Sequence, residues 1–120
     1  MSGGYFDYKN YALNEIAHQL EHLIKSNNVE DEYGYKRNYT DDTLKTFYSA
    51  TLISKMLEIM LHEIDYLVCS DTSEEDFDSA LTNKIIKLLS SEQTNLIQLI
   101  GEDNFKWFLT LFESEDNNND

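Results

Sequence analysis

The sequence predicts an all-α protein, a compact bundle of four to five helices around one long central helix at about residues 40–69. Across this central stretch, apolar side chains recur at three- and four-residue steps for roughly eight turns, which is the period of a helix and not of a strand. The 120-residue chain contains no proline and only 4 glycines. That composition suits long uninterrupted helices and argues against a turn-rich β-sandwich or barrel.

A first helix is expected at roughly Tyr8 to Ser26. Its apolar side chains form one stripe, which consists of Leu13, Ile16, Ala17, Leu20, Leu23 and Ile24. Asn27 and Asn28 follow this stripe. Because asparagine tolerates the left-handed backbone conformation of a helix C-cap, we expect the helix to stop there.

The helical pattern fails between residues 29 and 39, which predicts an exposed loop. Tyr33, Tyr35 and Tyr39 lie in this loop. These tyrosines either fold back over the core or present a contact surface, because tyrosine is enriched in interface hot spots. The sequence favours the first alternative and leaves the second open.

The start of the central helix carries three signals. Thr40 is a suitable N-cap, and Asp41 and Asp42 complement the positive end of the helix dipole. Tyr39 precedes the cap and is expected to pack on Leu44 as a hydrophobic staple. The beginning of this helix is therefore well specified.

Shorter helices are expected after the central one. Ser73 with Asp76 three residues later is a variant of the capping box and marks the start of a third helix. Ser91 is expected to cap a fourth helix that stops at Gly101, and a last helix is expected at roughly Asp103 to Phe112. Residues 1–112 are assigned to one domain, and residues 113–120 to a disordered acidic tail.

Charge and composition restrict the function. The chain has 23 acidic and 9 basic residues, a net charge of -14, so direct binding to nucleic acid or anionic lipid is not expected and a basic partner is favoured. The alternative is that the acidic surplus only keeps the protein soluble.

Charged residues such as Lys55 and Glu58 interrupt the most apolar helix, so no membrane span is expected. A single cysteine, Cys69, and a start without a signal-peptide pattern indicate the cytoplasm.

Three features are candidates for chemical sites. His18, Glu21 and His22 match an inverted zinc-peptidase pattern, and Glu15 with His18 forms a Glu-x-x-His pair. Both patterns lack the further ligands that such sites need, so no metal, no cofactor and no catalytic residue are predicted, and an enzyme is not expected. Cys69 lacks a neighbouring base and is interpreted as a small buried apolar residue.

Glu63 falls on the apolar side of the central helix. A carboxylate there needs a partner, because an unpaired buried charge is costly. We expect an ion pair with Lys84 or Lys87, which we favour over an acid–base role.

Two segments resemble a family of small acidic proteins encoded by bacteriophages and prophages, a family without an assigned activity. The segments are Tyr5–Tyr11 leading into Asn14–Ala17, and His62–Asp71 leading into Ser73–Phe77. Tyr66 stands where the family carries tryptophan, and Glu63 where it carries a basic residue. The resemblance implies a protein that acts in the cytoplasm of a bacterial host, where such proteins often look like anti-CRISPR or DNA-mimic inhibitors.

Two hypotheses follow from these observations. The first is an inhibitor that binds a basic, nucleic-acid-handling host protein, such as a CRISPR or other defence effector, through acidic residues. The candidate partner-binding residues are Glu30, Asp31, Glu32, Asp41, Asp42, Asp71, Glu74, Glu75, Asp76 and Asp78. The alternative is a homo-oligomeric module, such as a homodimer, with an aromatic contact surface formed by Trp107, Phe108, Leu111 and Phe112.

Overall fold

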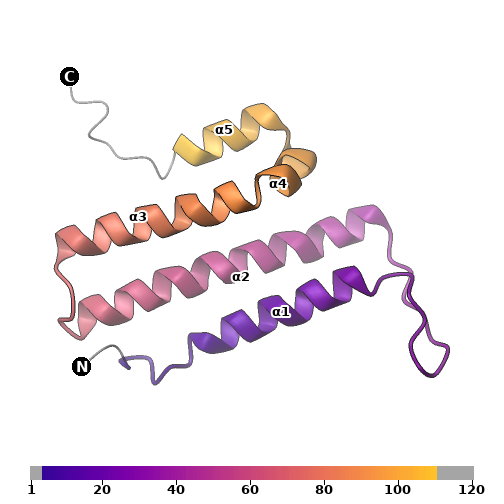
Figure 1. The fold of residues 1–120 in the computed structure, drawn as a ribbon, viewed down its shortest axis with the longest axis horizontal. Helices are drawn as coiled ribbons and strands as arrows, with labels where there is room; N and C mark the ends of the chain where they lie inside the picture. The colour runs from indigo at the N-terminus through magenta and orange to yellow at the C-terminus, as the bar shows by residue number, and fades with distance from the viewer. Residues whose placement is uncertain (1–3, 111–120) are drawn as a thin grey trace. The chain divides into compact units, whose positions relative to one another are not determined.

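The computed structural model describes residues 4–110 of the chain. This part of the chain forms five helices, α1 (Tyr11–Lys25), α2 (Asp41–Val68), α3 (Glu74–Ser91), α4 (Gln93–Ile100) and α5 (Glu102–Thr110), shown in Figure 1. None of the described residues lies in a strand, so the predicted all-α class is confirmed. The predicted long central helix corresponds to the 28 residues of α2.

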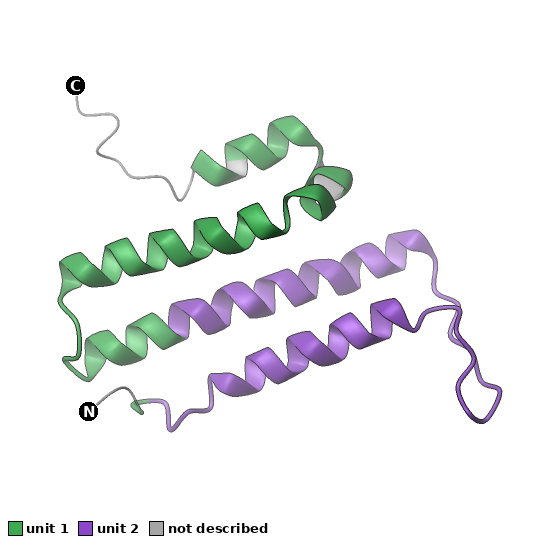
Figure 2. Ribbon diagram, in the orientation of Figure 1, with its two compact units in different colours: residues 1–5, 62–120 green, residues 6–61 purple. Residues whose placement is uncertain are grey.

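The chain divides into two compact units, coloured separately in Figure 2. One unit comprises residues 6–61, and the other comprises residues 1–5 together with residues 62–120. The boundary between the units falls within α2. We describe the two units separately.

In the unit of residues 6–61, α1 begins at Tyr11 and not at the predicted Tyr8. Asp7 and Tyr8 have positive backbone φ angles of 59° and 61°, which no right-handed helix accommodates. The predicted end of the helix is confirmed, because Asn28 has a φ of 65°, in the left-handed region.

Polar contacts join α1 to the part of α2 in the same unit. Ala17 is fully buried on α1, and Leu52 is buried on α2. At one side of this core, the Lys55 Nζ atom lies 2.6 Å from Glu21 Oε2. The Asn10 side-chain amide donates to Glu58 Oε2 at 3.4 Å, so both ends of α1 are tied to α2.

The start of α2 has the predicted cap. The Thr40 hydroxyl oxygen accepts a hydrogen bond from the Thr43 backbone N–H at 3.3 Å, which satisfies one of the unpaired donors of the first turn. Asp41 and Asp42 lie in this first turn. The Tyr39 ring packs at 5.3 Å from the Phe47 ring, one turn further along α2 than the expected contact with Leu44.

In the other unit, a short turn leads from the end of α2 to α3. Ser70 in this turn has a φ of 63°. The Ser73 hydroxyl oxygen accepts from the Asp76 backbone N–H at 3.1 Å, which confirms the predicted cap of α3. Among the described residues of this unit, the buried apolar ones are Ile85, Leu89, Leu96 and Phe105. They come from α3, α4 and α5, and α4 contacts both of its neighbouring helices.

The prediction that Ser91 caps the fourth helix is wrong. Ser91 is the last residue of α3, and its hydroxyl donates to the Leu88 carbonyl at 2.7 Å. Glu92 occupies the N-cap position of α4 without a side-chain cap bond. Gly101 ends α4 with a φ of 91°, as expected of a glycine stop.

The last helix, α5, begins at Glu102, one residue before the predicted start. The end predicted at Phe112 and the tail predicted at residues 113–120 lie outside the described residues. Among the helices that the structure describes, none is long and apolar enough to cross a membrane.

Candidate functional site

The loop of residues 29–39 is held in a hairpin-like conformation by hydrogen bonds between its own residues. The Asp31 backbone N–H donates to the Tyr35 carbonyl at 2.9 Å. The Asp31 carboxylate also accepts from the backbone N–H groups of Tyr33 and Tyr35, each at 2.9 Å. Gly34 completes the turn with a φ of 80°, a conformation that glycine adopts without strain. One aspartate therefore organises the tip of the loop.

The base of this loop is closed by Asn27 and Asn28. The Asn27 side chain accepts from the Tyr39 backbone N–H at 2.9 Å and donates to the Tyr39 carbonyl at 3.2 Å. The Asn28 backbone N–H donates to the Arg37 carbonyl at 2.7 Å. The same asparagines that end α1 thus fix the point where the loop returns to α2.

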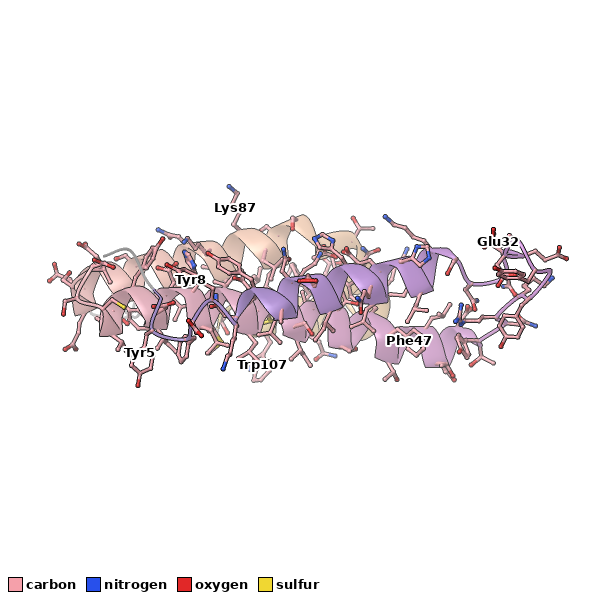
Figure 3. The ribbon with its side chains drawn as sticks, turned by 90° about the horizontal axis from the view of Figure 1, so that it is seen from below. Tyr5, Tyr8, Glu32, Phe47, Lys87 and Trp107 are labelled. Atoms are coloured by element: carbon pink, nitrogen blue, oxygen red, sulfur yellow. The ribbon has the colours of Figure 1, made fainter. Side chains whose placement is uncertain are left out.

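Every residue of this loop is exposed, although the Tyr39 ring packs against Phe47. Tyr33 is 86% exposed and Tyr35 is 62% exposed, with the Arg37 guanidinium 5.8 Å from the Tyr35 ring centroid. Glu30 and Glu32 are exposed as well. Figure 1 shows the loop projecting past the adjoining ends of α1 and α2, and Glu32 is labelled in Figure 3. Tyr33 and Tyr35 therefore do not fold over the core, and the contact-surface alternative is the one that the geometry favours.

A second group of acidic residues lies at the start of α3. Glu74, Glu75 and Asp76 occupy its first turn, and Asp78 follows; all four are exposed. The first three already complement the helix dipole. Asp71 precedes the helix and is exposed too.

Asp41 and Asp42 play the same helix-start role at α2, where Asp42 Oδ1 lies 3.8 Å from the Lys45 Nζ atom. With Glu30, Asp31 and Glu32 they belong to the unit of residues 6–61. The ten predicted partner-binding residues are therefore all exposed, but they are divided between the two units.

Glu63 has the ion pair that the sequence predicts. This residue is only 3% exposed, and its Oε2 atom lies 2.5 Å from the Lys84 Nζ atom. The His62 Nε2 atom lies 3.9 Å from the same oxygen, and the His62 ring packs at 4.5 Å from the Tyr66 ring. Lys84 is thus the partner, and the contact stabilises a buried carboxylate.

Asp65 is a buried carboxylate that the sequence analysis missed. It is 4% exposed and accepts backbone hydrogen bonds from Gly4 at 2.9 Å and from Tyr5 at 2.8 Å. The Cys69 thiol donates to it at 3.4 Å. Burial alone would raise the pKa of Asp65. The hydrogen bonds from the two N–H groups and the thiol lower the pKa by more than burial raises it, so it lies below the ordinary 3.8. Asp65 holds the N-terminal segment in its unit.

Cys69 is half-buried, in partial agreement with the interpretation of a buried apolar residue. Burial, followed by the hydrogen bond to Asp65, raises the pKa of this thiol above its ordinary value. A raised pKa disfavours the nucleophilic thiolate.

His18 and His22 are exposed on one side of α1. The His18 Nδ1 atom lies 3.5 Å from Glu21 Oε1. The hydrogen bond from Lys55 lowers the pKa of Glu21, and burial opposes this effect only in part. Glu15 is also exposed, and no group of three or more potential metal ligands occurs in the described part of the chain.

The proposed aromatic contact surface is described only in part. Trp107 is 63% exposed on α5, beside an ion pair of 3.4 Å between Lys106 and Glu102. The side chain of Phe108 and the whole of Leu111 and Phe112 lie outside the described residues.

Comparison with known proteins assigns no family to this chain. No protein-family profile matches the sequence, and neither a curated protein nor a solved structure matches the chain.

Proposed function

We propose that this chain is an interaction protein that binds a basic partner, with the loop of residues 29–39 as a principal contact. The observation that carries the proposal is the combination of a loop fixed by its own hydrogen bonds with tyrosine and glutamate side chains left in solvent. A loop that is already ordered loses little conformational entropy on binding. Exposed tyrosines contribute large contact areas at a low entropic cost.

The charge of the chain supports a basic partner. The net charge of -14 attracts a basic surface over a distance and repels nucleic acid. Glu30 and Glu32 lie next to Tyr33 in the loop, so charge and aromatic area occur together there. The exposed acidic residues of α3 are a further contact in the proposal, although their position in a helix start already gives them a structural role.

The partner class proposed here is a nucleic-acid-handling protein, such as a CRISPR or other defence effector. Such proteins carry basic surfaces that bind phosphates. Carboxylates on a rigid scaffold can occupy those surfaces in place of the nucleic acid. The resemblance to small acidic phage and prophage proteins supports an inhibitor in the cytoplasm of a bacterial host.

The proposal is tested by capturing partners from a bacterial lysate at low and high salt. Glu30→Lys with Glu32→Lys should abolish capture of a basic protein that the unaltered chain holds at low salt and releases at high salt. Glu15→Lys with Asp103→Lys changes the net charge by the same amount at exposed residues outside the loop and should leave capture intact. Equal capture by the loop variant and the unaltered chain would contradict the proposal.

A second candidate function is homo-oligomerisation through α5. Trp107 is a large aromatic residue that is mostly exposed, and such residues anchor interfaces. Sedimentation equilibrium should then show a dimer that Trp107→Ala converts to a monomer. A monomer of the unaltered chain at high concentration would remove this alternative.

A further inference from the structure

We propose that His18 and His22 form a two-ligand site for a divalent transition-metal ion on α1. The sequence predicts no catalytic metal at these histidines, because a catalytic site needs a third protein ligand. Binding alone needs fewer protein ligands, because water fills the remaining positions. The proposal is thus a binding site and is independent of the contact proposed for the loop.

The spacing of the two histidines suits one ion. Residues four apart on a helix lie on the same face, with Cβ atoms roughly 5 to 6 Å apart. Metal–nitrogen distances of about 2.0 to 2.1 Å allow two imidazoles at this spacing to reach the same ion. Both positions lie within α1, so the regular helix fixes their separation.

The surroundings of His18 prepare one of its nitrogens for a metal. The His18 Nδ1 atom faces Glu21 Oε1 at 3.5 Å, and Glu21 is itself held by Lys55 at 2.6 Å. A carboxylate beside one ring nitrogen keeps the proton on that side and leaves the other nitrogen, here Nε2, to bind the ion. Glu21 is therefore a positioning residue.

The side of α1 that carries the two histidines is open to solvent. A hollow of about 420 Å³ on the surface is lined by His18, Gln19, His22 and Leu23. Imidazole ligands favour Ni²⁺, Cu²⁺ and Zn²⁺, whereas Mg²⁺ prefers oxygen ligands. The net charge of -14 raises the local concentration of any cation, so the test must separate histidine binding from general attraction to carboxylates.

The experiment is a titration of the full chain, without a histidine tag, with Ni²⁺ at pH 7.5, followed by calorimetry and by NMR of the histidine rings. Paramagnetic Ni²⁺ should broaden the ring signals of His18 and His22 and spare those of His62, while Mg²⁺ should change none of them. His18→Asn and His22→Asn should each weaken Ni²⁺ binding by about tenfold or more, because each removes one of two protein ligands.

Glu21→Gln tests the positioning role and should weaken Ni²⁺ binding by about tenfold, as is typical when the partner of a ligating histidine is altered. Circular dichroism checks that α1 remains folded in each variant. Unchanged Ni²⁺ affinity in both histidine variants, or equal broadening at His62, would overturn the proposal.

Discussion

The carboxylates in the last turns of α2 and those in the loop of residues 29–39 differ in what they contact. Glu63 and Asp65 are buried, and each is satisfied by a specific group: the Lys84 ammonium for Glu63 and the backbone N–H groups of Gly4 and Tyr5 for Asp65. In the loop, Glu30 and Glu32 are exposed. Part of the acidic surplus therefore has a structural role.

Within the loop, Asp31 differs from Glu30 and Glu32. Asp31 is exposed, yet its carboxylate accepts two backbone hydrogen bonds that order the turn. A charge reversal at Asp31 would change the loop conformation as well as its charge. This residue is therefore excluded from variants that test binding through charge.

The largest predicted effect comes from removing the cation beside Glu63. Lys84→Met leaves a buried carboxylate without its nearest partner, which should lower the free energy of unfolding by about 2 to 3 kcal/mol. This figure is below the range for fully buried pairs, because the Lys84 side chain is 48% exposed. Urea denaturation measures the effect.

Lys87→Met is the matched control for this prediction. Lys87 is exposed on the same helix, so its replacement should change the free energy of unfolding by no more than about 0.5 kcal/mol. Equal stability of the two variants would show that Glu63 does not depend on Lys84.

A smaller effect is expected for the exposed acidic residues at the start of α3. Glu75→Gln should lower the free energy of unfolding by about 0.3 to 1 kcal/mol at low salt, because it removes a charge that complements the helix dipole. Asp78→Asn lies beyond the first turn and should have less effect. If both variants lost the same stability and salt did not reduce the loss, the dipole explanation would be wrong.

The last effect is expected at Asp65, and it depends on pH. The pKa of Asp65 in the folded state lies below 3.8, so its ionised form favours folding. The resulting stabilisation is fully present above about pH 4 and is lost as the pH falls through the folded-state pKa. Asp65→Asn should lack this part of the pH dependence.

Amide hydrogen exchange tests whether Asp65 stabilises the N-terminal segment. In Asp65→Asn the backbone amides of Gly4 and Tyr5 should exchange faster, because the replacement amide is a weaker acceptor than a carboxylate. Unchanged exchange at both residues would contradict the proposed tether.

The sequence predicts those features that arise from neighbouring residues. Periodicity identifies α2, and local side-chain bonds allow the caps at Thr40 and Ser73 to be predicted. The partner of Glu63 was predictable because an acidic residue among apolar ones requires a cation, and few lysines were within reach on the following helix.

Features that depend on distant contacts were missed. Nothing near Asp65 in the sequence indicates that its partners are backbone amides about 60 positions away. The predicted start of α1 at Tyr8 is too early, because the sequence does not reveal the positive φ angles at Asp7 and Tyr8. Of the candidate site, sequence alone identified the acidic and tyrosine residues of the loop but not the order that Asp31 and Asn27 impose on it.

The central claim is that the loop of residues 29–39 contacts a basic partner, and photo-crosslinking tests it most directly. A photoreactive phenylalanine analogue is placed at Tyr33 in one protein and, as a control, at the exposed Glu15 in another. In bacterial lysate at low salt, the protein labelled at position 33 should crosslink to a basic protein and the control should not. Crosslinking of a basic protein from position 15 alone would contradict the claim.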